Sequence, residues 1–193
     1  MKLLIDRRHA LGLIAALGLA ACSRESPPTT SPGDIPMADA VDALAEMGRG
    51  FSAGTPMSRQ VVYVLFDPQC PHCGHLWNAS QPLLSRTRFV WLPVAILNAK
   101  SRPQGAALMA ADDPVAAMNE HEKLLLAGQG GLSASASVPK DIGEAIALNT
   151  ELLQRLGADA VPFIVTRHAG SGATVSHGGS LSTEALASLI GLP

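Results

Sequence analysis

A pair of cysteines separated by two residues, Cys70 and Cys73, is the feature that most constrains how this chain can fold. The pair follows a β-branched and aromatic run, residues 61–66, which predicts a buried strand. Apolar positions at helical spacing come after it, and Pro71 fits the first position of a helix, where a missing N–H costs no hydrogen bond. We therefore expect the cysteines at a junction between a strand and a helix.

Two thiols at this spacing suit redox chemistry better than structural cross-linking. A disulfide that closes so short a loop restricts the unfolded chain very little, so it adds little stability. At a helix start, the helix dipole and free N–H groups favour a Cys70 thiolate, and a chargeable His72 acts in the same direction. Cys70 is the expected nucleophile, and Cys73, one turn further on, is the expected resolving thiol.

Other uses of paired cysteines fit this motif less well. A c-type haem site requires His directly after the second cysteine, whereas Gly74 follows Cys73 and His75 comes one residue later. A structural zinc site needs four ligands, and the sequence has no second cysteine pair. Transient Cu(I) binding by two thiolates is chemically reasonable, so a copper-handling chaperone is the alternative function.

The remainder of the sequence predicts one mixed α/β domain over residues 59–193. Hydrophobic residues make up 47% of the 193 residues and charged residues 16%, which suits a packed domain and not a disordered chain. After the motif, the expected elements are strand 89–97, helices 106–111, 115–126 and 142–156, strands 163–166 and 173–177, and helix 182–190. This is the order of a thioredoxin fold with a helical insertion after the second strand. The net charge of −2 provides no basic surface for nucleic acid.

The N-terminal part of the chain has the pattern of an export signal. Residues 1–21 combine a basic start, an apolar run too short to span a bilayer, and small residues. The run closes on Leu19-Ala20-Ala21-Cys22, which looks like a bacterial lipobox, where Cys22 would be lipidated. The alternative is ordinary signal cleavage that leaves Cys22 as a free thiol.

Two further segments are expected between this signal and the domain. Residues 22–36 are rich in Ser, Thr and Pro and predict a flexible tether. Residues 37–58 predict a short amphipathic helix followed by a linker. Together they would hold the domain away from a membrane surface.

From about residue 60 onward the chain resembles the periplasmic thiol:disulfide interchange proteins of the DsbC/DsbG group. The resemblance rests on Asp67-Pro68 before the cysteine motif, Trp77 after it, an inserted helical region over 101–118, and the segment 157–165 around Val161-Pro162. It implies a thioredoxin-like fold, nucleophilic Cys70, resolving Cys73, and a cis Pro162 whose preceding Val161 backbone pairs with an extended substrate.

The resemblance also implies the partners and the location of the protein. Substrates would be exported proteins with cysteines, and a membrane redox partner would recycle the dithiol. The expected location is the periplasm, on a lipid anchor, with Ser23 after Cys22 favouring the outer membrane. No cofactor beyond the Cys70–Cys73 disulfide and no metal is expected.

The sequence departs from that group in ways that leave the direction of electron flow open. Val161 replaces the threonine usual in the isomerases, and Pro71-His72 is a dipeptide of the oxidase type. The long N-terminal dimerisation domain of the isomerases is not expected either, because residues 35–58 accommodate one helix at most. A depressed thiol pKa would favour an oxidising disulfide.

Several other residues have simpler expected roles. Asp67 is equally consistent with tuning the thiol and with shaping a turn with Pro68. The aromatic side chains of Trp77 and Trp91 are expected in the core or in a groove, and three histidines, His121, His168 and His177, are expected at the surface or in the hairpin.

Overall fold

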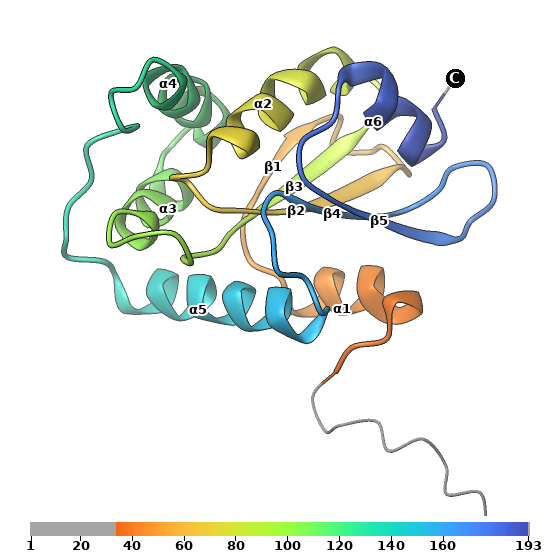
Figure 1. Ribbon diagram of the computed structural model, residues 1–193, viewed down its shortest axis with the longest axis horizontal. Helices are drawn as coiled ribbons and strands as arrows, with labels where there is room; N and C mark the ends of the chain where they lie inside the picture. The colour runs from red at the N-terminus through yellow and green to blue at the C-terminus, as the bar shows by residue number, and fades with distance from the viewer. Residues whose placement is uncertain (1–33, 193) are drawn as a thin grey trace, which may run out of the picture. The chain divides into compact units, whose positions relative to one another are not determined.

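The computed structural model describes residues 34–192 (Figure 1). The expected export signal, Cys22 and most of the tether lie outside these residues. The helices are α1 (Ala40–Met47), α2 (Pro71–Ser80), α3 (Ser101–Ala110), α4 (Pro114–Leu126), α5 (Lys140–Arg155) and α6 (Thr183–Ile190). The strands are β1 (Phe51–Gly54), β2 (Val61–Phe66), β3 (Arg88–Pro93), β4 (Phe163–Arg167) and β5 (Thr174–Gly178). Within residues 34–192, no helix has both the length and the apolar character needed to cross a membrane.

The strands form one five-stranded sheet in the order β1-β3-β2-β4-β5. The central strand β2 is parallel to β3 and antiparallel to β4, and β1 and β5 join the two edges in antiparallel orientation. Helices cover both faces of the sheet, with α2 and α6 on one face and α1 and α5 on the other (Figure 1). The dithiol helix α2 therefore begins directly beyond the end of the central strand.

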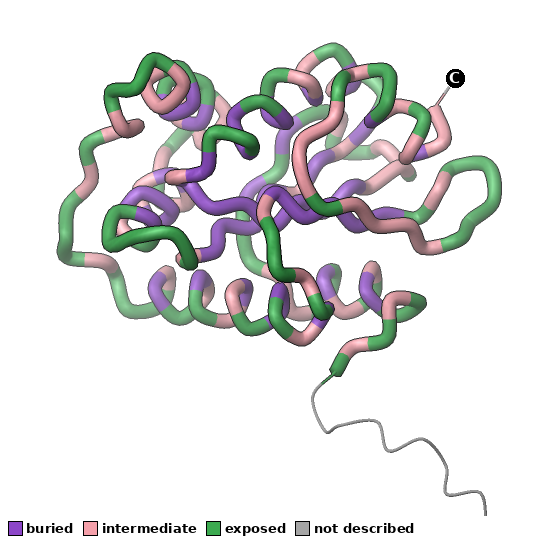
Figure 2. The backbone as a smooth tube through the Cα atoms, viewed as in Figure 1, coloured by how far each residue is buried: buried purple, intermediate pink, exposed green. Residues whose placement is uncertain are grey.

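The central strand is apolar on both sides because each of its faces packs against helices. Val62, Val64 and Phe66 lie in one cluster with side chains of α2 and α6, whereas Tyr63 and Leu65 lie in a second cluster with α1 and α5. Successive residues of a strand point to opposite faces, so a strand covered on both faces shows no polar alternation. Figure 2 shows the resulting buried strands at the centre of the sheet.

The structure corrects the expected linker within residues 37–58. This segment contains the edge strand β1, in which Phe51 pairs with Trp91 of β3. Phe51 and Ala53 are buried in the core while the residues between and after them are exposed. The inserted helices follow the strand expected over 89–97, as predicted, and with β1 counted this is the third strand of the chain.

The inserted helix α4 has a capped start and a side-chain hydrogen bond to the dithiol helix α2. The side chain of Asp113 caps α4 by accepting a hydrogen bond from the Ala116 N–H at 3.0 Å, and Pro114 occupies the first helical turn. The Trp77 indole of α2 donates to the Asn119 side-chain oxygen of α4 at 2.8 Å. The inserted helix is thereby held at a fixed position over α2.

The burial of α1 can be tested by truncating one of its side chains. Leu44 is 1% exposed and packs in the cluster on the α5 face, so Leu44→Ala should lower the free energy of unfolding by about 2–5 kcal/mol. Denaturant unfolding followed by circular dichroism measures this change. The matched control is Glu46→Ala on the exposed side of the same helix. Equal unfolding midpoints for the two variants would mean that α1 is not part of the folded unit.

Candidate active site around the Cys70–Cys73 dithiol

Cys70 lies at the start of α2, immediately before Pro71. Its backbone is extended (φ −97°, ψ 109°), so Cys70 is the capping residue directly before the first turn of the helix. Its N–H donates to the Asp67 carbonyl at 2.9 Å. Cys73 lies one turn further on. Both cysteines are free thiols, and both are buried, with Cys70 4% exposed and Cys73 fully enclosed. Pro71 and His72 between them are exposed, so the motif reaches the surface through its middle residues.

The pKa values of the two thiols are shifted in opposite directions. A hydrogen bond from the Cys73 thiol lowers the pKa of Cys70 to about 6, aided by the N–H groups of Cys73 and His72 and by the charge of His72. Burial opposes this effect without cancelling it. Burial raises the pKa of Cys73 well above its ordinary value. At neutral pH the site therefore holds one thiolate, on Cys70, and one protonated thiol, on Cys73.

The segment before β4 lies beside the nucleophile. The Val161–Pro162 peptide bond is cis, and the Cys70 Sγ lies 3.5 Å from the Val161 carbonyl oxygen, to which Cys70 donates when its thiol is protonated. Val161 is half-buried and Pro162 is buried. Residues far apart in the sequence are thus brought together at one end of the sheet.

Asp67 is fully buried, and its carboxylate is surrounded by backbone donors. One oxygen accepts from the Gln69 N–H at 2.8 Å, and the other accepts from Ile96 at 2.8 Å and from Leu97 at 3.0 Å. These contacts support the turn-shaping role of Asp67. The same side chain also ties the loop after β3 to the turn that carries Cys70.

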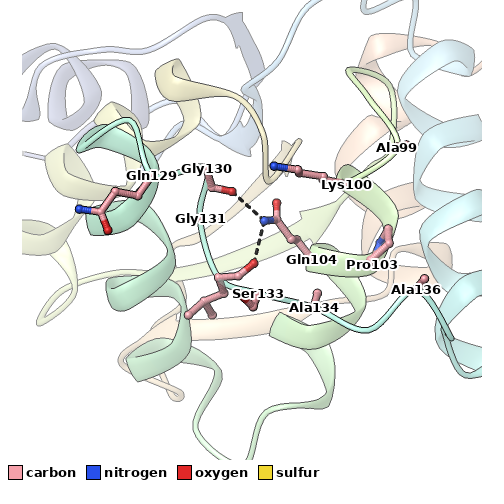
Figure 3. Close-up of a pocket in the computed structure, with 11 residues that line it drawn as sticks. Ala99, Lys100, Pro103, Gln104, Gln129, Gly130, Gly131, Ser133, Ala134 and Ala136 are labelled. Atoms are coloured by element: carbon pink, nitrogen blue, oxygen red, sulfur yellow. Dashed lines mark hydrogen bonds between the residues drawn. The ribbon is translucent and has the colours of Figure 1, made fainter.

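A second polar network joins the dithiol turn to the inserted helices. The Gln69 amide donates to the side-chain oxygen of Gln104 in α3 and to the Gly130 carbonyl. The Gln104 amide donates to the carbonyls of Gly130 and Leu132 at 2.8 Å each. Gln104 forms one wall of a cavity of about 390 Å³ between α3 and the loop 129–136 (Figure 3). Its amide is fully used in holding that loop.

The structure corrects the expected surface position of His121. Its ring is fully buried, with Nε2 2.7 Å from the Pro68 carbonyl and Nδ1 accepting from the Leu132 N–H at 3.2 Å. These partners require a neutral ring with the proton on Nε2, and burial lowers the pKa of His121 accordingly. His168 and His177 are half-buried, in the hairpin and on β5. A single histidine in a helical pattern gave no sign of this buried role.

Glu122 is a further buried residue that the sequence reasoning missed. It is 1% exposed, and neither carboxylate oxygen has a hydrogen-bond partner within the described residues. A Cβ at Gly74 would lie 2.4 Å from Glu122 Oε2, so the carboxyl packs directly on the backbone of α2. Burial and then the negative charge of Cys70 raise the pKa of Glu122 to about 8. Gly74 is the one sequence feature that hints at this contact. A glycine inside a helix costs about 1 kcal/mol of stability relative to Ala, so its presence suggests that another group packs closely against the helix there.

Metal-ligating side chains do not gather elsewhere in residues 34–192, where no group of three or more His, Cys, Asp or Glu could hold a metal ion. His72 and His75 are both exposed on α2, with ring centroids 6.4 Å apart.

Comparison with curated proteins finds two related sequences, while no family model matches the chain. The thiol:disulfide interchange protein DsbG of Pseudomonas aeruginosa is 29% identical over 159 residues, which cover 81% of this chain and 60% of that protein. The DsbG of Escherichia coli is 28% identical over 106 residues, covering 54% of this chain and 42% of that protein. The chain thus matches only part of the length of each relative.

Solved structures with the same fold come from several bacteria. The catalytic domain of Proteus mirabilis ScsC has a TM-score of 0.63 at 17% identity, covering 80% of this chain and 94% of that domain. The thiol-disulfide exchange protein α-DsbA2 of Wolbachia pipientis has a TM-score of 0.60 at 15% identity, with the same two coverages. At these identities the likeness establishes the fold.

The fold and the dithiol together define a thioredoxin-like protein with a helical insertion, which confirms the expected fold class. Within that class, its sequence relatives are the two DsbG proteins, which it resembles over part of their length.

The acidity of the Cys70 thiol gives a direct prediction for its pH dependence. The ultraviolet absorbance of the reduced protein should show one thiolate forming with a midpoint near pH 6, because the folded structure lowers the pKa of Cys70 to about 6. The thiolate is lost as the pH falls through that midpoint. Cys73→Ala removes the largest stabilising contact and should move the midpoint upward, whereas Cys70→Ser should abolish the step. A native midpoint near the unperturbed value of about 8.5 would contradict the geometry.

Proposed function

We propose that this protein is a thiol:disulfide oxidoreductase that exchanges disulfides with the cysteines of exported proteins. The observation that carries the proposal is the asymmetry of the dithiol, in which a thiolate-forming Cys70 at a helix start is paired with a buried, protonated Cys73. The DsbG relatives, which are named thiol:disulfide interchange proteins, support the same activity.

Exchange begins when the Cys70 thiolate attacks a sulfur of a substrate disulfide. A bond forms between Cys70 and that sulfur, the substrate S–S bond breaks, and the other substrate sulfur leaves as a thiolate. Cys73, as its thiolate, then attacks the Cys70 sulfur and releases the remaining substrate thiolate, leaving the protein disulfide. The same steps in reverse oxidise a substrate dithiol. Repeated exchange among several substrate cysteines rearranges the disulfide bonds of the substrate.

The surroundings of Cys70 suit an extended, unfolded substrate. The Val161 backbone lies beside the Cys70 sulfur, where a substrate strand can pair with it in the manner of β-augmentation. Ile96 and Leu97 are exposed apolar side chains at 41% and 49%, and the Asp67 carboxylate fixes their backbone next to the dithiol turn. This apolar edge would contact substrate side chains flanking the cysteine.

The electrostatics of the site favour an oxidising disulfide. Stabilising the Cys70 thiolate stabilises the reduced dithiol, which makes the disulfide form a stronger oxidant. His72, exposed beside Cys70, contributes its charge in the same direction. We therefore place this protein nearer to the oxidases than to the thioredoxin-type reductants.

The location and the recycling partner follow from the N-terminal sequence and from the chemistry. The signal-like residues 1–21 and the lipobox-like Cys22 support export to the periplasm and lipid anchoring there. Ser23 after Cys22 favours the outer membrane as the anchoring membrane. Among solved structures of similar fold is a periplasmic thioredoxin-like protein from Salmonella enterica. Net oxidation or reduction of substrates changes the redox state of the dithiol, and we propose that a membrane redox partner restores it.

The order of the two cysteines in the reaction can be tested by trapping. Cys73→Ser should accumulate mixed disulfides with exported proteins through Cys70, because the second thiol no longer releases them. Non-reducing electrophoresis of purified protein, followed by reduction, measures these adducts. Cys70→Ser and the double variant are the controls and should trap almost nothing. Adducts formed mainly by Cys70→Ser would reverse the assigned roles.

The lipid anchor can be tested separately through Cys22. The unaltered chain expressed in a Gram-negative bacterium should fractionate with membranes, whereas Cys22→Ser should be released with the soluble fraction or remain unprocessed. Metabolic labelling with a fatty-acid analogue should mark only the unaltered chain. Equal fractionation and no labelling of either protein would refute lipidation.

A further inference from the structure

Among residues 34–192, Glu122 is a carboxyl group buried against the dithiol helix that the exchange reaction above leaves without a role. It comes from the inserted helix α4 and lies over Gly74, the residue directly after Cys73. Its two oxygens have no hydrogen-bond partner in the described part of the chain. An unpaired buried carboxyl is costly, so a side chain that only filled space here would be expected to be apolar.

The charged and titratable groups around Glu122 single out the dithiol as its partner. Of the elements packed against α4, α2 supplies Cys70 and Cys73 together with exposed His72 and His75, and β1 supplies no titratable residue. In α3 the candidate is Arg102, whose guanidinium lies against Gly143 of α5.

On α4 itself, the neighbouring titratable groups are directed elsewhere. Glu120 and Lys123 form an exposed ion pair, and His121 contacts Pro68 and Leu132. The electrostatic coupling of Glu122 is therefore to the two cysteines, and it acts in both directions. The charge of Cys70 raises the pKa of Glu122, and the charge of Glu122 contributes to the raised pKa of Cys73.

We propose that Glu122 is the proton acceptor for the Cys73 thiol when the mixed disulfide on Cys70 is resolved, an inference that rests on the proposed function. Cys73 is fully buried and strongly favours its protonated form, so it needs a nearby base before it can attack. The Glu122 carboxylate is buried against Gly74, the residue directly after Cys73 in α2.

The proton and the electrons balance in this step. The Cys73 S–H proton passes to the Glu122 carboxylate, and the electron pair left on Cys73 sulfur forms the bond to Cys70 sulfur. The bond between Cys70 and the substrate sulfur breaks, and that sulfur leaves as a thiolate. In the oxidising direction, protonated Glu122 returns the proton to Cys73 as the protein disulfide opens.

The charge state of Cys70 determines when the Glu122 carboxylate is available as a base. In the reduced protein the Cys70 thiolate helps to keep Glu122 protonated at neutral pH. In the mixed disulfide Cys70 carries no charge, so one of the two causes that raise the pKa of Glu122 is removed. The carboxylate form is then more populated at the stage at which Cys73 must lose its proton.

Ellman's reagent separates the two chemical steps in a stopped-flow experiment on the reduced protein. Attack by Cys70 releases a first equivalent of coloured thiolate at a rate proportional to reagent concentration. Attack by Cys73 on the mixed disulfide releases a second equivalent at a rate independent of reagent. Glu122→Gln should slow the second phase at least about tenfold at neutral pH, since general base catalysis typically contributes about a hundredfold or more. The substitution should leave the rate of the first phase within about twofold of that of the unaltered protein, because Glu122 is mostly neutral while Cys70 is a thiolate.

The matched control is Glu120→Gln, which removes the same charge from the exposed face of the same helix and should change neither phase. The pH profile distinguishes proton transfer from a packing role. In the unaltered protein the second phase should rise with pH and level off once Glu122 is ionised, whereas in Glu122→Gln it should keep rising with hydroxide. Glu122→Asp, which keeps a carboxyl group, should restore part of the plateau.

Each outcome decides between the two proposals. A Glu122→Gln second phase within twofold of the unaltered protein overturns the role of Glu122, as does an unaltered protein whose second phase never levels off. The second of these results does not depend on whether the variant folds. If the unaltered protein releases no coloured thiolate at all, the proposed exchange activity itself fails.

Discussion

The hydrogen bond from one thiol to the other is the interaction on which this site depends. It places the negative charge on Cys70 and the proton on Cys73, although both sulfurs are buried in the same apolar cluster. Burial alone would raise the pKa of both thiols and make the pair unreactive at neutral pH. The start of α2 overcomes this for one sulfur only, because Cys70 accepts from the Cys73 thiol and from backbone N–H groups, whereas Cys73 is the donor of that bond and is more deeply buried.

Holding a charged sulfur in such surroundings requires a rigid turn, and buried polar side chains supply it. Asp67 binds three backbone N–H groups, and His121 bridges Pro68 to the loop after α4. These side chains do not touch the reacting sulfurs. They fix the backbone between β2 and α2 from both sides, so that the helix start keeps its geometry when substrate binds and leaves.

The parts predictable from sequence are those whose signal is local. The strand, proline and cysteine spacing around Cys70 predicted the dithiol and its helix. The apolar runs predicted the type and order of the later elements, although β3 ends at Pro93 and α3 begins at Ser101, earlier than expected in both cases. The edge strand β1 was missed because four residues that include a glycine, held mainly by pairing with β3, carry no pattern of their own. His121 and Glu122 were missed for another reason. Their burial is decided by where α4 docks, and the apolar pattern of that helix does not mark the face on which they lie.

The glycine after the second cysteine carries a consequence for how such sites diversify. Because Gly74 has no side chain, the carboxyl of Glu122 can rest on the helix backbone, and even a methyl group would occupy that space. Positions 74 and 122 are therefore expected to covary, with any larger residue at the first accompanied by loss of the acid at the second. Transplanting only the four-residue cysteine motif into another thioredoxin-like scaffold would leave this partnership behind. The inserted helix α4 thus contributes a titratable group to the dithiol site that the cysteine motif alone does not carry.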